Sequence, residues 1–141
     1  MKIAICPGSY DPVTYGHLDI IKRSAVLVDK LIVTVFVNPS KKTSLFSIEE
    51  RLDMLRETTK DIPNVEVDTS TGLLNVYAAS KNCHLLIRGL RAFSDFEYEF
   101  QRALMIKKID PTLETAFFMT DGRYSYLSLS LIHISEPTRL R

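Results

Sequence analysis

The sequence has little of what marks secreted, membrane-bound or nucleic-acid-binding proteins. Its 141 residues include only two cysteines, Cys6 and Cys83, which lack metal-ligand spacing and suit a reducing cytoplasm better than a disulfide scaffold. The formal net charge of +1 provides no broad positive field for nucleic acid or an anionic membrane. No apolar run reaches the ~20 residues of a membrane span, and the N-terminus lacks a signal-peptide pattern. We therefore expect a cytoplasmic protein that binds neither nucleic acid nor membrane.

What the sequence does contain is a regular alternation of strands and helices. With 45% hydrophobic residues, the chain is long enough for one domain with a continuous core. Short apolar runs predict strands at residues 2–6, 31–37, 65–67, 85–87 and 115–119. The β-branched run at 31–37 is typical of a strand covered on both faces of a parallel sheet. The order predicts an α/β fold with a Rossmann-like, open, doubly wound sheet of five parallel strands.

Two helices carry a predicted start signal. Ser47 with Glu50, and Ser94 with Glu97, have the spacing of capping boxes, in which a hydroxyl and a carboxylate each accept a backbone N–H. Asp110 and Pro111 predict the end of the second of these helices.

The spacing of apolar residues predicts which helix faces point into the core. In the helix expected after Gly72, the predicted core stripe is Leu73, Val76 and Tyr77. In the helix after Ser94, the predicted core face is Phe96, Phe100, Ala103 and Leu104.

A turn-rich loop carries the first candidate for function. Residues 7–17 read PGSYDPVTYGH and join the first strand to a helix that opens on Gly16 and His17. The N-terminus of a helix presents free backbone N–H groups and the positive end of the helix dipole, both of which favour an anion. The motif therefore indicates a phosphate site. The alternative is a tight turn with an incidental histidine.

Basic side chains follow two other strands. Arg88 and Arg91 come directly after a buried strand, where a guanidinium requires an anionic partner, either a phosphate or an internal carboxylate. Lys41 and Lys42 are a weaker signal, because a lysine pair in a loop is as often a solvated surface. Since ligands of such folds bind outside the carboxyl ends of the strands, we expect these groups to converge with the loop at 7–17.

Two carboxylates lie on one face of the helix that follows the arginines. Asp95 and Glu99 are four residues apart, near the point where Arg91 enters. They either pair with an arginine or contact a nucleobase or ribose, and the sequence leaves both open. His84 precedes a strand and is interpreted as a packed or surface histidine.

Together these motifs resemble a known family. The run at 14–17, TYGH, matches the (T/H)xGH signature of the nucleotidylyltransferase superfamily. The combination of PSKK at 39–42 with RGLRAFSDFEYE at 88–99 is similar to the bacterial phosphopantetheine adenylyltransferase family, and the resemblance extends to about Ser128. It implies transfer of the adenylyl group of ATP to 4′-phosphopantetheine, which gives dephospho-coenzyme A and pyrophosphate without a covalent enzyme intermediate. It also implies Mg²⁺ bound mainly through the ATP phosphates, with no protein ligand, and a homohexamer if the C-terminus is intact.

The resemblance implies a role for each matching residue. The catalytic residues would be His17, Lys41 and Arg91, with His17 donating a hydrogen bond to the α-phosphate. The 4′-phosphopantetheine would contact Ser9, Lys41, Leu74 and Arg88. The ATP contacts would be Ser9, Tyr10, His17, Gly89, Leu90, Arg91, Glu99, Tyr124, Ser125, Tyr126, Leu127 and Ser128. Family members usually have threonine-phenylalanine where Ser9 and Tyr10 stand, and both replacements keep a hydroxyl and an aromatic ring.

The C-terminal segment departs from the family pattern. The serine-rich ATP motif begins correctly at 124–128, YSYLS, and then continues LSLIHISEPTRLR where the family has further serines and a helix. The segment resembles translated sequencing-adaptor sequence, so we interpret residues 1–128 as a truncated nucleotidylyltransferase domain and 129–141 as a non-native tail. Leu129 cannot supply a hydroxyl to the polyphosphate. We therefore expect impaired ATP binding, stability or assembly.

Two alternative functions remain open at this point. One is another nucleotidylyltransferase of the same fold, acting on glycerol phosphate or nicotinate mononucleotide. The other is a non-catalytic module that binds a nucleotide or coenzyme A.

Overall fold

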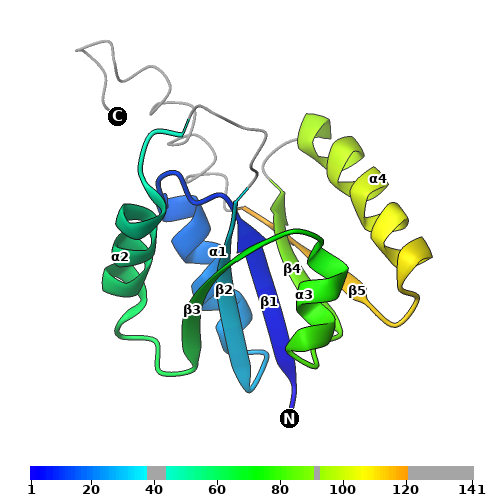
Figure 1. Cartoon of the computed structure of the whole chain (residues 1–141), viewed down its shortest axis with the longest axis horizontal. Coiled ribbons are helices and arrows are strands. Elements are labelled where there is room, and N and C mark those ends of the chain that lie inside the picture. The colour runs from blue at the N-terminus through cyan, green and yellow to red at the C-terminus, as the bar shows by residue number, and fades with distance from the viewer. Residues whose placement is uncertain (38–43, 91–92, 121–141) are drawn as a thin grey trace.

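Five parallel strands form the centre of the structure. The structure is a computed structural model that describes residues 1–37, 44–90 and 93–120. In the last of these ranges, side chains are described from residue 96 onward. The strand order in the sheet is β3-β2-β1-β4-β5, and every neighbouring pair is parallel (Figure 1). This confirms the predicted open α/β sheet. The strands are β1 (Ile3–Gly8), β2 (Lys30–Val37), β3 (Val65–Thr71), β4 (Leu85–Leu90) and β5 (Glu114–Met119).

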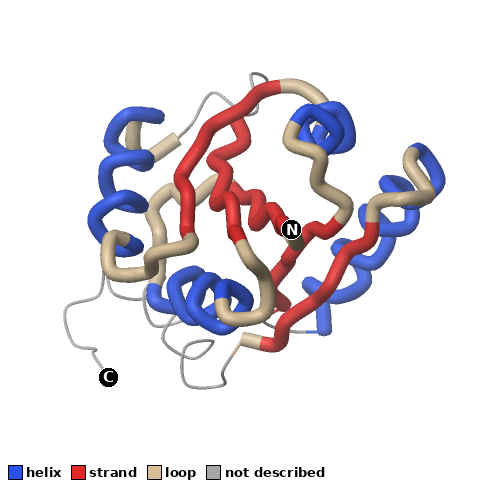
Figure 2. Tube along the Cα trace, turned by 90° about the horizontal axis from the view of Figure 1, so that it is seen from below, coloured by secondary structure: helices blue, strands red, loops and turns tan. Residues whose placement is uncertain are grey.

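Helices cover both faces of the sheet, as expected for a doubly wound fold. Seen from below, α1 and α2 lie on one face and α3 and α4 on the other (Figure 2). Because side chains alternate along a strand, β1 sends Ala4 and Cys6 into the core under α1 and α2, and Ile5 into the core under α3. The helices are α1 (Tyr15–Ala25), α2 (Ile48–Thr59), α3 (Leu74–Ser80) and α4 (Phe93–Ile109).

One of the two predicted capping boxes is confirmed and the other is wrong. Ser47 is the N-cap of α2: its hydroxyl accepts the N–H of Glu50, whose carboxylate accepts the N–H of Ser47. α4, in contrast, begins at Phe93, so Ser94 lies inside the helix rather than before it. β4 runs to Leu90, beyond the predicted end at residue 87.

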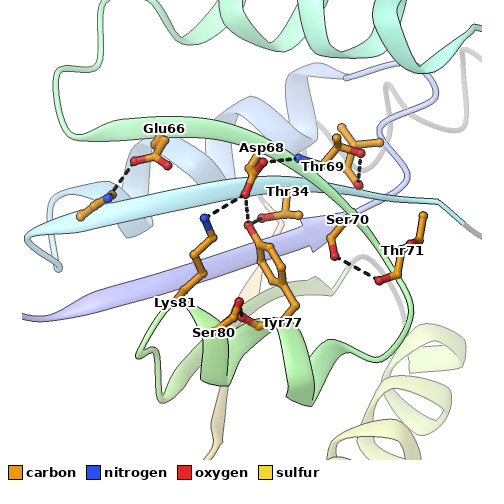
Figure 3. Close-up of polar contacts among 11 residues, drawn as sticks. Thr34, Glu66, Asp68, Thr69, Ser70, Thr71, Tyr77, Ser80 and Lys81 are labelled. Carbon is orange, nitrogen blue, oxygen red and sulfur yellow. Dashed lines mark hydrogen bonds and ion pairs between the residues drawn. The ribbon is translucent and has the colours of Figure 1, made fainter.

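The predicted core stripe of α3 is also partly wrong. Leu73 and Val76 are exposed, and the buried residues are Tyr77 and Ala78. The Tyr77 hydroxyl donates to Asp68 Oδ2 over 2.6 Å and lies 3.0 Å from the hydroxyl of Thr34, so α3 is tied to β3 and β2 through one side chain (Figure 3). Burial and the Asp68 bond raise the pKa of Tyr77 well above its usual range, which keeps the phenol protonated.

The predicted core face of α4 is wrong, because none of its four residues is buried: Phe96, Phe100 and Leu104 are exposed, and Ala103 is partly buried. Phe96 and Phe100 stack on each other with ring centroids 5.5 Å apart, and each is more than two-fifths exposed. Leu104 is 49% exposed. α4 packs against β4 and β5 at the end of the sheet (Figure 1).

A substitution at Leu55 tests the packing of the core under α2. Its side chain is fully buried, so truncation to alanine removes apolar burial and leaves a cavity. We expect Leu55→Ala to lower the free energy of unfolding by about 3 kcal/mol, measured by urea denaturation. Leu45→Ala is the control, because Leu45 is 77% exposed. Equal effects of the two substitutions would contradict this packing.

The strand order places a topological switch at the centre of the sheet. From β1 the chain moves outward through β2 to β3, and then returns to β4 and β5 on the opposite side. Helices diverge from the sheet at such a point, which leaves a crevice at the carboxyl ends of β1 and β4. None of the described helices is long and apolar enough to span a bilayer.

Candidate active site

A cavity of about 430 Å³ lies at this switch point. Its walls come from the end of β1 and the loop that follows, the start of α1, the second half of β4 and two later side chains. The lining residues are 6–12, Thr14, Gly16, His17, Ile20, 87–89, Glu99 and Thr120. The predicted convergence of the loop at 7–17 with Arg88 is therefore confirmed.

His17 is oriented by the N-terminus of α1. Thr14 is the N-cap, and its hydroxyl accepts the N–H of His17 over 3.2 Å. In return the N–H of Thr14 donates to Nδ1 of His17 over 3.0 Å. Because Nδ1 accepts a hydrogen bond, the neutral ring carries its proton on Nε2. The capping geometry thus makes Nε2 of His17 a hydrogen-bond donor.

The ring of Tyr10 packs against the ring of His17. Tyr10 is 2% exposed, and its ring meets the His17 ring edge-on with centroids 4.9 Å apart. Its hydroxyl donates to the carbonyl of Cys6 over 2.9 Å, so the phenol is committed to the protein rather than offered to a ligand. Burial raises the pKa of Tyr10 well above its usual range. A Cβ at Gly8 would lie 3.1 Å from the ring, which explains why glycine stands there.

Arg88 lies at the opposite wall and has an internal carboxylate partner. Its Nε is 3.4 Å from Oε1 of Glu99, and its Nη1 donates to the carbonyl of Pro7 over 3.4 Å. The side chains are 14% and 20% exposed. Burial lowers the pKa of Arg88, while the charge of Glu99 opposes that shift. Glu99 Oε1 is buried and makes no hydrogen bond within the described residues, so this pair is incompletely satisfied and faces the cavity.

Gly89 lets α1 pack tightly on β4. A Cβ at this position would lie 3.1 Å from Cγ1 of Ile20, a contact that forces the helix outward. Leu90 is buried next to it but does not line the cavity, and Leu74 packs against the core under α3. The structure therefore brings Ser9, Tyr10, His17, Arg88, Gly89 and Glu99 together, and leaves Leu74 and Leu90 outside the cavity wall.

Several predicted site residues lie outside the described ranges. These are Lys41, Arg91 and the segment Tyr124, Ser125, Tyr126, Leu127 and Ser128, whose roles stay predictions. Glu99, expected near Arg91, contacts Arg88. Sequence reasoning did not single out Thr14 as the residue that orients His17. The signal was present, since a threonine three residues before a helical side chain is the spacing of an N-cap.

Within the residues that the structure describes, no group of three or more histidine, cysteine, aspartate or glutamate side chains is placed to hold a metal ion. The predicted magnesium therefore stays a prediction, with its ligands to come from the nucleotide.

The fold and this cavity define a nucleotidyltransferase of the cytidylyltransferase-like class, whose family model matches residues 5–133. The chain is 61% identical to the phosphopantetheine adenylyltransferase of Caldanaerobacter subterraneus subsp. tengcongensis over 132 residues, which cover 94% of this chain and 82% of that protein. It is 57% identical to the enzyme of that name from Desulfosudis oleivorans, over 94% and 78% of the two chains. The chain belongs to the phosphopantetheine adenylyltransferase family.

Solved structures share the fold at low sequence identity. A lipopolysaccharide core biosynthesis protein from Thermoplasma volcanium superimposes with a TM-score of 0.60 and 18% identity, over 86% of this chain and 97% of that one. The NadR protein in complex with NAD and AMP-PNP gives a TM-score of 0.60 and 20% identity, over 96% of this chain and 42% of that one.

Proposed function

We propose that the protein transfers the adenylyl group of ATP to 4′-phosphopantetheine and releases pyrophosphate, a step of coenzyme A biosynthesis. The observation that carries the proposal is the fixed Nε2 donor of His17, held across one cavity from Arg88 in a chain of this family. A phosphate oxygen of the acceptor attacks the α-phosphorus, the bond to the bridging oxygen breaks, and pyrophosphate departs. No enzyme nucleophile is required.

Catalysis then consists of positioning and charge stabilisation. Two anions that repel each other must be held together, and negative charge grows on the α-phosphoryl oxygens in the transition state. Nε2 of His17 and the N–H groups at the start of α1 would donate to those oxygens. Ser9 and Arg88 would bind the acceptor phosphate, and the predicted roles of Lys41 and Arg91 add further positive charge to the same reaction.

We propose Mg²⁺ as the remaining cofactor, held by ATP rather than by the protein. The two carboxylates at the cavity are already engaged, because Asp11 accepts backbone N–H groups and Glu99 pairs with Arg88. Because these carboxylates are already bonded within the protein, the site fits a metal ion that is coordinated by the phosphates of the bound nucleotide. When bound, the ion neutralises charge on the departing pyrophosphate.

We also propose a cytoplasmic location and, for a chain that carries the family's intact C-terminus, a homohexamer. Apolar side chains remain exposed along α4, including Leu104, Met105 and Ile109, and such a surface favours association between copies. The two thiols, Cys6 and Cys83, are free and buried, which is compatible with a reducing compartment.

Pyrophosphate release from ATP tests the reaction. We expect turnover with 4′-phosphopantetheine and background rates with glycerol 3-phosphate and nicotinate mononucleotide, measured by a coupled pyrophosphate assay. Faster release with either of the other two acceptors would favour the alternative nucleotidylyltransferase. Tight binding of ATP or coenzyme A by calorimetry, with no turnover on any acceptor, would favour a non-catalytic module.

A further inference from the structure

A buried arginine on α2 reaches the loop that forms one wall of the cavity. Arg51 is 6% exposed, unlike most charged residues of this helix. Its Nη1 donates to the carbonyl of Ser9 over 3.1 Å, and its Nε donates to the carbonyl of Phe46 over 3.1 Å. One guanidinium therefore joins the loop after β1 to the segment that leads into α2.

Asp11 makes the reciprocal connection. Its two carboxylate oxygens accept the N–H groups of Leu45 and Phe46, each over 2.8 Å. Each charged side chain thus bonds to the backbone of the opposite segment. We call this set of hydrogen bonds, which holds residues 9–11 against residues 45–47, the Arg51–Asp11 clamp.

The loop held by the clamp has an unusual backbone. Tyr10 has a φ of +47°, in the left-handed region that residues other than glycine seldom adopt. Such a conformation persists when the surroundings over-determine it, and the clamp bonds the residues on both sides of Tyr10. Ser9 and Asp11 line the cavity, so the clamp sets where the wall of the anion site lies.

The charge of Arg51 has a second effect on the site. Its hydrogen bonds go to neutral carbonyls, and none of the ion pairs within the described residues includes it. A guanidinium buried in this way keeps its positive charge close to Ser9 and to the cavity wall. The Asp11 carboxylate lies in the same clamp and lines the cavity, so it offsets part of this positive charge.

We propose that Arg51 is a positioning residue for the acceptor phosphate, acting through the Arg51–Asp11 clamp on Ser9. The inference rests on the proposed function, since it assigns Ser9 to the phosphate of 4′-phosphopantetheine.

Steady-state kinetics of Arg51→Met and Arg51→Lys test the proposal. Methionine keeps an unbranched aliphatic chain but lacks the positive charge and the planar guanidinium donors, whereas lysine keeps the charge. We expect Arg51→Met to raise the KM for 4′-phosphopantetheine by at least about tenfold and that for ATP by less than about threefold. Arg51→Lys should raise the KM for 4′-phosphopantetheine by an intermediate factor. If Arg51→Met does not fold, the KM values of Arg51→Lys test the proposal instead. Arg56→Met, on the exposed face of the same helix, should match the wild type.

A double-mutant cycle separates positioning from general stability. If Arg51 and Asp11 act through one clamp, Asp11→Asn and Arg51→Met should be strongly non-additive in kcat/KM. A lower melting temperature with unchanged kinetic constants would overturn the inference and leave the proposed function standing. So would an equal rise in both KM values. A protein with a restored family C-terminus that turns over no 4′-phosphopantetheine would overturn the proposed function, and the inference with it.

Discussion

Replacement of His17 by alanine should lower kcat by about 10²–10³-fold, the usual effect of removing one preorganised donor to a developing oxyanion. Thr14 and Tyr10 orient the ring of His17, a residue that lines the cavity. We expect its Nε2 to donate to the α-phosphoryl group, on which charge accumulates in the transition state. The same donor contributes little to ground-state binding. We therefore expect the Kd for ATP, measured by calorimetry, to change by less than about threefold.

The matched control for this prediction is His84→Ala. His84 is exposed at the start of β4, at the opposite end of that strand from the cavity, and its removal should leave kcat unchanged. An affinity for ATP that falls as steeply as kcat in His17→Ala would contradict the assigned role, because it would place the histidine in uniform binding rather than in transition-state stabilisation.

Removal of Arg88 should damage both activity and stability. Arg88→Met withdraws a charged donor from the cavity, and we expect kcat/KM for 4′-phosphopantetheine to fall by about 10²-fold, since hydrogen bonds to charged groups contribute roughly 1.5–3 kcal/mol. It also leaves Glu99 without its partner. Because both side chains are mostly but not fully buried, the free energy of unfolding should fall by about 2 kcal/mol, below the range for a fully buried pair. Urea denaturation measures the second effect.

The double variant Arg88→Met with Glu99→Gln separates the two effects. It removes the isolated carboxylate, so stability should return toward the wild-type value, while activity should stay low because the phosphate has lost its cation. Recovery of activity in the double variant would mean that Arg88 serves only to neutralise Glu99. That was one of the two interpretations that the sequence left open for this arginine.

The elements with long, unambiguous patterns were predictable from the sequence. The β-branched run of β2 and the box formed by Ser47 and Glu50 specify their structures locally, and both predictions are confirmed. Ser94 and Glu97 have the same spacing as that box. There the prediction failed: β4 extends to Leu90 and the helix already begins at Phe93, so Ser94 lies inside it. A cap pattern cannot report where the preceding strand ends.

The face of α3 could not be decided from periodicity. Leu73, Val76 and Tyr77 have i, i+3, i+4 spacing, and so do Leu74, Tyr77 and Ala78. The second set faces the sheet: Ala78 is buried and Leu74 packs against the same core. Tyr77, which belongs to both sets, also reaches Asp68 and Thr34 on neighbouring strands through its hydroxyl. This long-range polar contact leaves no trace in a hydrophobic pattern.

Some residues of the candidate site could be predicted from the sequence, and others could not. Residues at strand ends and at the start of α1 were predictable, since parallel strands bring their carboxyl ends to one edge. Arg51 was not, because one arginine in a charged helix has no signature of burial. The link between Asp11 and residues 45–46 spans more than thirty positions of sequence and could only be found in three dimensions.

The two halves of the sheet are unequally joined. β1 pairs with β2 along its whole length, from Ile3 to Gly8, whereas the register of β1 with β4 is defined at Ile5 opposite Leu86. The cavity lies across this narrower seam, with Ser9 and His17 on one side and Arg88 and Glu99 on the other. A ligand that contacts both walls therefore acts as a cross-link between halves. Ligand binding and folding are thermodynamically linked, so a substrate that contacts both walls stabilises the folded protein.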